Sequence, residues 1–418
     1  MPETIRDIRE LPQDHTWYMT SEHVLMPDAE QKSADARYNA LYFSPWHRTK
    51  PLRTLDSVRK SFLKFELNPG YGENLRKRDP TWAKNLRDMA ALDGYPNMSR
   101  SGITTRNTDL RILPTRKPVF YSRSGYPFDR LQVSLISANT PIYISHVSRD
   151  KTWFLVETPY ACGWLDARHI ALADENFKRK WEKGTYVAII TDKTPIYDDQ
   201  NHFLFNAPLG SLFPFISETD NTIRIMYAAG DTTKRAITGE TLLSSEAAAV
   251  KPLPLAGANM IRIANNLTNE AYGWGGLYEN RDCSAMLKDM FAPFGLWLSR
   301  HSADQAKRDG YFIDLAPLSL EVKEKTIRER GVPYMTLLWM RGHIMLYIGQ
   351  YEGELLVFHN LWGVSTANLW GMRKRLTVGH AAITTLRPAR IFNTSSPNES
   401  DFLKNVIGMT LLGEQPDF

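Results

Sequence analysis

The chain opens with two stretches that differ in hydrophobic spacing. Residues 1–30 are polar, contain several prolines and show little periodicity, which predicts an irregular N-terminal arm. Over residues 31–109 apolar positions recur mostly at helical spacing. In LDSVRKSFLKF, for example, Val58, Phe62 and Phe65 share one face, and TWAKNLRDMAAL repeats the pattern. We therefore expect a small helical domain after the arm.

The next part of the chain changes to strand-like alternation. Short apolar runs separated by Pro, Gly, Ser and Asp fill residues 110–180, and this spacing is typical of a small all-β barrel. The tetrapeptide TPIY at 140–143 returns at 194–197, each time after a β-rich run and before a polar turn. This repeat predicts a second barrel over residues 181–250.

Residues 251–418 mix helical and strand-like patterns. After Cys283, apolar residues recur at helical spacing in SAMLKDMF, so the cysteine is predicted to begin a helix whose apolar face enters a core. Further on, GHIMLYIG and ELLVFHN flank a polar turn that contains glycine, which predicts a β-hairpin. If this hairpin is symmetric about Tyr351, His343 and His359 face one another across it.

These patterns predict an α+β multi-domain protein, and composition narrows its class. The chain has 418 residues and is 43% apolar, enough for several separate cores. Its 51 Lys and Arg against 46 Asp and Glu leave a net charge of +5, spread along the chain. No basic arm is present, so we expect no nucleic-acid partner. No long apolar run and no apolar leader occur, so we expect neither a transmembrane segment nor an export signal.

The two cysteines exclude a disulfide-rich scaffold and a zinc site built on thiolates, while one disulfide stays open. Cys162 lies in the strand-like run YACGWL and fits a buried apolar role. Cys283 fits either a buried role or a nucleophile. At a helix start, capped by Asp282 or Ser284, the helix dipole favours its thiolate.

A thiolate nucleophile needs a base, and the base needs an orienting group. His343 and His359 meet this need if they lie across the hairpin, because one imidazole can then orient the other. Two other interpretations stay open. Either histidine alone fits an ordinary strand residue, and the pair could also hold a metal. Local spacing provides no third ligand for a metal, although His301 is a candidate.

The order WGG, DCS, helix, GH in a strand and His in the next strand resembles the NlpC/P60 cysteine peptidases. The resemblance extends over much of the chain. RILPTRKPVF, FDRLQ, the TPIY pair and CGWLDARHIA are similar to the signatures of tandem bacterial SH3-type barrels. With a helical N-terminal clip, this order resembles the γ-D-glutamyl-L-diamino acid endopeptidases. The resemblance implies a papain-like C-terminal domain behind two SH3-like barrels.

The resemblance also implies roles for individual residues. Cys283 matches the nucleophile, His343 the general base and His359 the group that orients this base. Asp282 and Ser284 match positions that bind the free amino end of a stem peptide. The expected substrate-binding residues are Asp282, Ser284, Ser302, Tyr272, Trp274 and Tyr160. Two positions depart from the family pattern: His301 stands where relatives often have aspartate, and Ala285 where glycine is frequent.

Carried over as a whole, the resemblance implies a cysteine endopeptidase that cleaves the γ-D-Glu–diamino acid bond of peptidoglycan stem peptides or muropeptides. No cofactor or metal is implied. Two alternatives belong to other classes: a non-catalytic peptidoglycan-binding envelope protein, and an amidase or acyltransferase on the same fold. The family acts mainly at the cell envelope or periplasm, whereas a start without a leader also suits muropeptide recycling in the cytoplasm.

Overall fold

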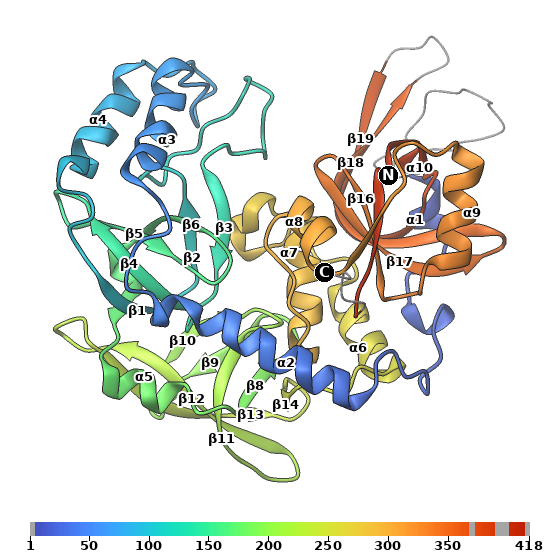
Figure 1. The fold of residues 1–418 in the computed structure, drawn as a ribbon, viewed down its shortest axis with the longest axis horizontal. Coiled ribbons are helices and arrows are strands. Elements are labelled where there is room, and N and C mark those ends of the chain that lie inside the picture. The colour runs from blue at the N-terminus through green and yellow to red at the C-terminus, as the bar shows by residue number, and fades with distance from the viewer. Residues whose placement is uncertain (1–4, 368–372, 389–400, 414–418) are drawn as a thin grey trace. The chain divides into compact units, whose positions relative to one another are not determined.

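The computed structural model describes residues 5–367, 373–388 and 401–413 (Figure 1). The chain divides into two compact units. The terminal unit comprises Met1–Asp35, Pro252–Tyr272 and Asn280–Phe418. The middle unit comprises Ala36–Lys251 and Gly273–Glu279. The predicted order of a helical beginning, two β-rich modules and an α+β end is confirmed.

The first hundred residues are mainly helical, as predicted. Their helices are α1 (Arg6–Glu10), η1 (His15–Trp17), α2 (Asp28–Phe43), η2 (Ser44–His47), α3 (Leu55–Leu67), α4 (Thr81–Ala90) and η3 (Leu92–Gly94). Thr54 caps α3 by accepting a hydrogen bond from the Ser57 N–H at 3.2 Å. The predicted apolar face of α3 is buried, and α4 ends at Ala91, whose φ is +53°.

The first β module is a seven-stranded sheet with the order β3-β2-β6-β5-β4-β1-β7. Its strands are β1 (Arg100–Thr104), β2 (Thr108–Arg111), β3 (Gln132–Ile136), β4 (Pro141–Val147), β5 (Trp153–Glu157), β6 (Cys162–Asp166) and β7 (Ile170–Leu172), with η4 (Ala167–His169) between the last two. The expected closed barrel is therefore an open sheet. It also begins before residue 110, so the predicted boundary at 109/110 falls inside it.

The second β module follows α5 (Glu175–Trp181). It consists of a five-stranded sheet with the order β13-β12-β11-β8-β14 and a two-stranded sheet of β9 and β10. Its strands are β8 (Tyr186–Ile189), β9 (Thr194–Tyr197), β10 (Phe203–Ala207), β11 (Leu212–Glu218), β12 (Thr222–Gly230), β13 (Ala236–Ser244) and β14 (Ala248–Lys251). The second TPIY forms β9, and most of the first belongs to β4. The repeat thus marks strands in both modules, and this module too is open.

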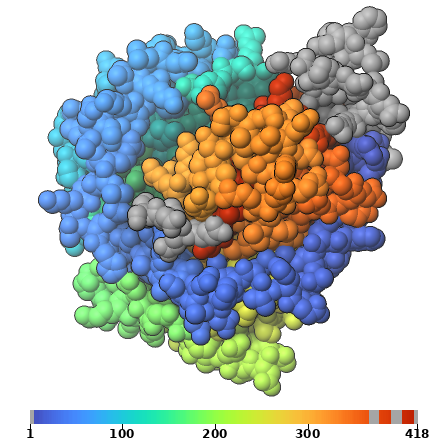
Figure 2. Space-filling view, turned by 45° about the vertical axis from the view of Figure 1, so that its right-hand side comes forward, coloured from blue at the N-terminus to red at the C-terminus, as the bar shows by residue number. Residues whose placement is uncertain are grey.

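The terminal unit is built on a six-stranded sheet with the order β15-β20-β16-β17-β18-β19. Its strands are β15 (Tyr311–Asp314), β16 (Thr336–Met340), β17 (His343–Tyr351), β18 (Glu354–Ala367), β19 (Arg373–Thr385) and β20 (Gly408–Leu411). Its other helices are α6 (Gly257–Leu267), α7 (Cys283–Phe291), η6 (Ala292–Phe294), α8 (Ser302–Arg308), α9 (Leu320–Arg330) and α10 (Phe402–Asn405). Helix α7 packs against β17 and β18. In Figure 2 the orange part of the terminal unit forms a continuous area of the visible face.

The N-terminal arm differs from the sequence expectation. It was expected to be irregular over residues 1–30, yet it contains α1, and α2 begins at Asp28. Ile5 is fully buried in the core of the terminal unit. Burial of this side chain stabilises the short helix, which has little intrinsic stability at this length. The arm is thus part of the terminal unit's structure.

Candidate active site

Cys283 is the first residue of α7, as the sequence pattern predicts. Asp282 caps this helix, because its Oδ1 accepts a hydrogen bond from the Ala285 N–H at 2.9 Å. The apolar positions after the cysteine are buried, so the helix is held by its core face. This packing fixes the position of the thiol at the helix start.

The thiol of Cys283 is nearly buried, with 8% of the residue exposed. Burial raises the pKa of Cys283 to about 12, and the neighbouring Asp282 charge acts in the same direction. Hydrogen bonding by the backbone of Ile344 and the positive charge of Arg300 oppose this shift and lower the pKa. Desolvation of the thiol therefore acts against the thiolate that the helix dipole favours. The hydrogen bond with the Ile344 backbone also places the thiol at the beginning of β17, where Ile344 follows His343 in the chain.

The predicted hairpin of β17 and β18 forms, but in another register. Tyr351 pairs with Glu354 instead of lying at the centre of the turn, and a bulge shifts the pairing again further along. The predicted direct pairing of the two histidines is therefore wrong. Their side chains nevertheless meet, with His343 Nε2 2.7 Å from His359 Nδ1. Long side chains on neighbouring strands can reach one another diagonally, so contact survives the change in register.

The hydrogen bonds around His359 fix which ring nitrogens carry protons. The Thr384 hydroxyl donates to the Thr385 carbonyl at 2.9 Å, and its oxygen lies 3.0 Å from His359 Nε2. Since that hydroxyl proton is already used, His359 Nε2 carries a hydrogen and donates to Thr384. His359 Nδ1 is then an acceptor, and His343 Nε2–H donates to it. His343 Nδ1 consequently has a free lone pair, which a general base requires.

Both imidazoles are neutral in this arrangement. Burial lowers the pKa of His343 to about 4. It also lowers the pKa of His359 well below the usual value, and the neighbouring His343 adds to this effect. The resting site therefore contains a thiol and a neutral imidazole, and the proton has to move when substrate is bound.

The N-terminal arm supports this histidine pair from behind. Asp7 Oδ2 accepts hydrogen bonds from the Thr385 N–H at 2.7 Å and from the Thr385 hydroxyl at 2.8 Å. These bonds fix the end of β19 where Thr384 contacts His359. Sequence analysis missed both threonines and Asp7, because they lie far from the motif in the chain.

A second group that sequence analysis missed is the buried Arg300. Its two terminal nitrogens bind the two oxygens of Asp282 at 3.1 and 2.7 Å, and one of them also donates to the Ser284 hydroxyl at 3.0 Å. Two-point binding of this kind suits the planar guanidinium. Gln305 donates to the Ser284 carbonyl at 2.8 Å. Asp282 and Ser284 are thus brought together beside the thiol as predicted, but as part of a buried ion pair.

We expect Arg300→Met to lower the free energy of unfolding of the terminal unit by about 3–5 kcal/mol, because it leaves the Asp282 carboxylate buried without its partner. Urea unfolding followed by circular dichroism measures this change. Arg308→Met is the matched control, since Arg308 pairs with Asp304 at an exposed position. Equal stability of the two variants would contradict the importance of the buried pair.

The remaining predicted residues of the terminal unit lie close in sequence to these groups. Ser302 begins α8, and His301 precedes it as the N-cap residue. Burial, together with the positive charge of Arg300, lowers the pKa of His301. The Tyr272 ring lies 5.9 Å from that of Trp362, and its N–H donates to the Gly379 carbonyl at 2.8 Å. The binding roles of Ser302 and Tyr272 stay predictions.

Trp274 and Tyr160 belong to the middle unit. The indole Nε1–H of Trp274 donates a hydrogen bond to the Asp129 carbonyl at 2.9 Å, so this side chain is held within the middle unit. The adjacent Gly276 has a φ of +86°, and a Cβ atom would lie 2.4 Å from the Leu135 side chain. The glycine turn within η5 (Trp274–Glu279) is thus held against β3. Tyr160 is half-buried, with its hydroxyl 3.3 Å from that of Tyr38.

Both cysteines have free thiols, so the disulfide left open by the sequence does not form. Burial raises the pKa of Cys162 to about 11. Within the described part of the chain, no three His, Cys, Asp or Glu side chains gather as they would around a metal ion, so His301 does not join the histidine pair. Among the same residues, no helix has the length and apolar character needed to cross a bilayer.

Four protein-family models match the chain. The N-terminal stabilising domain of NlpC/P60 proteins matches residues 1–95. An SH3 domain of the SH3b1 type matches residues 118–166, and one of the SH3b2 type matches residues 174–220. The NlpC/P60 family itself matches residues 269–375, which include the cysteine and both histidines of the site.

One solved structure matches this organisation over its whole length. The chain is similar to an NlpC/P60 endopeptidase from Photobacterium damselae subsp. piscicida, with 25% identity, a TM-score of 0.86 and full coverage of both chains. An NlpC/P60 family protein from Bacillus cereus ATCC 10987 is 14% identical over 67% of this chain and 82% of the other, with a TM-score of 0.46. No curated protein matches the sequence. The chain therefore carries a domain of the NlpC/P60 family, preceded by the family's N-terminal stabilising domain and two SH3 domains.

Proposed function

We propose that this protein is a cysteine endopeptidase that hydrolyses the γ-D-Glu–diaminopimelate bond of peptidoglycan stem peptides. The observation that carries the proposal is the hydrogen-bonded series His343–His359–Thr384 beside the helix that begins with Cys283. A thiol next to a neutral imidazole, itself oriented by a third group, is the arrangement that nucleophilic acyl chemistry requires. The NlpC/P60 match supports a cell-wall hydrolase.

The geometry suggests the following sequence of steps. His343 Nδ1 takes the proton of Cys283, and the thiolate attacks the γ-carbonyl of D-Glu. His343, now charged, stays hydrogen-bonded to the lone pair of His359 Nδ1. It gives its proton to the diaminopimelate amine as the C–N bond breaks, which leaves a thioester on Cys283. Water then loses a proton to His343 and attacks the thioester, which releases the acyl product and restores the thiol.

We also propose that the site prefers stem peptides with a free L-Ala amine. A cationic amine needs acceptors that cost little to desolvate. Asp282 and Ser284 are held together by Arg300 at the start of α7, and Ser302 follows Arg300 closely in the chain. The ion pair with Arg300 offsets part of the cost of burying the Asp282 carboxylate. The proposed place of action is the cell envelope or periplasm.

Mass spectrometry of L-Ala-γ-D-Glu-diaminopimelate after incubation with the protein tests this proposal. We expect L-Ala-D-Glu and free diaminopimelate from the free peptide, and much slower release from the N-acetylated peptide. Equal rates would contradict the amine preference alone. If an added amine accepts the acyl group in place of water, this result would favour the acyltransferase interpretation. A folded protein that binds peptidoglycan without cleaving the peptide would show a binding protein instead.

We expect Thr384→Val to reduce kcat/KM about tenfold, because valine cannot accept the His359 Nε2–H and the imidazole loses its preferred tautomer. Thr384→Ser keeps the hydroxyl and should restore most of the activity. The loss should appear mainly in kcat, since Thr384 does not contact substrate in this account. A Thr384→Val protein with unchanged kcat would contradict the assigned tautomer.

The pH dependence of kcat/KM should reflect the buried pair. Burial lowers the pKa of His343 to about 4, so this base stays neutral above that value and is lost only as the pH falls through it. The raised pKa of Cys283, about 12, keeps the thiol protonated throughout the neutral range. We therefore expect an acid limb with a midpoint below 6.5 and a flat profile from about pH 6.5 to 9. A midpoint at 6.5 or above, or a rise near pH 8.5, would contradict this account.

A further inference from the structure

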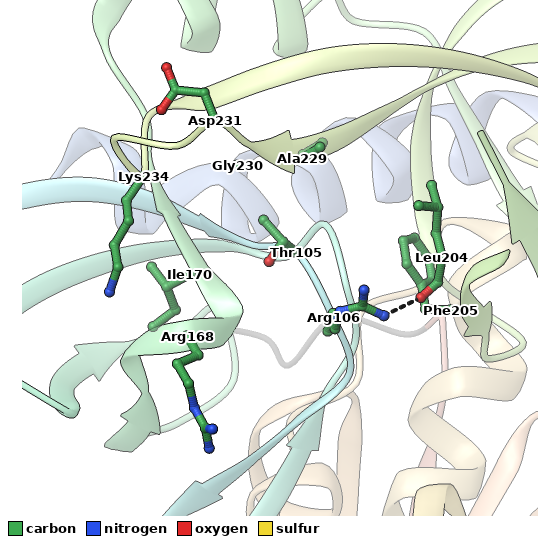
Figure 3. Close-up of a pocket in the computed structure, with 11 residues that line it drawn as sticks. Thr105, Arg106, Arg168, Ile170, Leu204, Phe205, Ala229, Gly230, Asp231 and Lys234 are labelled. Carbon is green, nitrogen blue, oxygen red and sulfur yellow. Dashed lines mark hydrogen bonds between the residues drawn. The ribbon is translucent and has the colours of Figure 1, made fainter. Parts of the chain in front are cut away.

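A cavity of about 300 Å³ lies in the middle unit, and none of the residues assigned to the reaction lines it (Figure 3). Both β modules contribute to it. Its lining residues are Thr105, Arg106, Arg168, Ile170, Leu204, Phe205, Ala228, Ala229, Gly230, Asp231 and Lys234. The two modules thus form a shared concave surface that neither has alone.

The cavity combines apolar and cationic walls. Ile170, Phe205 and Ala228 are buried and provide apolar surface. Arg106, Arg168 and Lys234 are exposed and add three positive charges. A ligand that fits both kinds of wall has an aliphatic part and an anionic end.

The cationic side chains are held in place mainly by uncharged partners. Arg106 donates to the Leu204 carbonyl at 2.5 Å, as Figure 3 shows, and Lys234 donates to the Ala167 carbonyl at 3.3 Å. Neither forms an ion pair within the described part of the chain. Arg168 binds Asp166 at 3.1 and 3.0 Å, but Asp166 also pairs with Arg116. The positive charge of the lining is therefore only partly compensated.

The single acidic residue of the lining is engaged by its own turn. Asp231 accepts hydrogen bonds from the Thr233 N–H and hydroxyl and from the Arg235 N–H. Its second oxygen binds Arg235 Nε at 3.1 Å. These hydrogen bonds lower the pKa of Asp231 to about 2, and the bond from the Thr233 side chain has the largest effect. Arg235 is not a lining residue, so Asp231 does not neutralise the three lining cations.

We propose that this cavity is a second binding site for the carboxylate end of a short peptide, and that its natural ligand is a peptidoglycan stem peptide. The choice of a stem peptide rests on the proposed function. Carboxylates on methylene arms occur in both D-Glu and diaminopimelate, and they match the cationic rim and the apolar wall together. The volume is at the lower limit for small-molecule pockets, so it accepts one or two residues of the peptide. Such a site adds a second point of attachment for the polymer.

Isothermal titration calorimetry of the full chain tests the site. All proteins carry Cys283→Ala, which prevents turnover, and the probe is L-Ala-γ-D-Glu-diaminopimelate. We expect Arg106→Gln/Lys234→Gln to weaken one binding event by about tenfold or more, and added salt to weaken it further. The matched control is Arg179→Gln/Lys183→Gln, which removes the same charge from exposed residues outside the lining and should bind as the parent does.

Two results would overturn the proposal. One is an identical isotherm for the lining variant and its control. The other is inorganic phosphate, titrated in parallel, competing for the site as strongly as the peptide, which would assign the cavity to phosphate groups. Because binding is measured without turnover, this outcome is independent of whether the peptide is hydrolysed. If the wild-type protein does not hydrolyse the peptide but the peptide still binds in this cavity, only the proposed activity would be rejected.

Discussion

Cys283→Ala is expected to lower kcat/KM for L-Ala-γ-D-Glu-diaminopimelate by roughly 10⁴-fold or more, because it removes the thiol that forms the acyl intermediate in the proposed reaction. The fold should survive this change. Cys283 is almost buried, but alanine keeps its helical position and Asp282 still caps the helix through the Ala285 N–H. Liquid chromatography of the released diaminopimelate measures the rate.

Cys162→Ala is the matched control for this experiment. Cys162 is the other free thiol of the chain, lies in β6 of the middle unit and has a pKa that burial raises to about 11. Its replacement should leave kcat/KM unchanged. Retained hydrolysis by the Cys283 variant, or its loss in the Cys162 variant alone, would assign the nucleophile elsewhere.

His343→Ala is expected to reduce kcat by about 10²–10⁴-fold, since the buried thiol then has no group to accept its proton. The raised pKa of Cys283 makes this loss larger than in a site that rests as a thiolate. A small effect on KM is expected, because the imidazole acts on the reacting atoms. Initial rates over a range of peptide concentrations separate the two constants.

The control for the base is His202→Ala, which removes an exposed imidazole that pairs with Asp198 in the middle unit. The kcat of His359→Ala should lie between those of His343→Ala and His202→Ala, because this change disturbs the tautomer of His343 without removing the base. A His343→Ala protein as active as the His202 variant would show that another group accepts the thiol proton.

Local sequence patterns predicted much of this site. The spacing of apolar residues after Cys283 indicated a helix that begins there, and the structure shows it with Asp282 as its cap. The alternation around His343 and His359 indicated a hairpin, and the two imidazoles do meet. The register was predicted wrongly because the turn was centred on Tyr351, whereas Tyr351 pairs with Glu354 and so belongs to the strand. The bulge in β17 then shifts the pairing again.

The groups that support the site could not be predicted in this way. Arg300 binds Asp282, and Asp7 binds Thr385 across more than three hundred residues of chain. These contacts depend on tertiary packing, which residue spacing does not encode. The desolvation of Cys283 could not be predicted either, because it depends on which side chains cover the thiol. The two β modules were recognised from the TPIY repeat, but they were expected to be barrels, whereas their sheets are open.

Intact-protein mass spectrometry during turnover tests the central claim most directly. The wild-type protein is mixed with L-Ala-γ-D-Glu-diaminopimelate and quenched in acid within the first turnovers, and any adduct is located by peptide mapping. The account predicts a thioester of L-Ala-γ-D-glutamate on Cys283 in the wild type and none in Cys283→Ala. An adduct on another residue, or continued hydrolysis by Cys283→Ala, would contradict it.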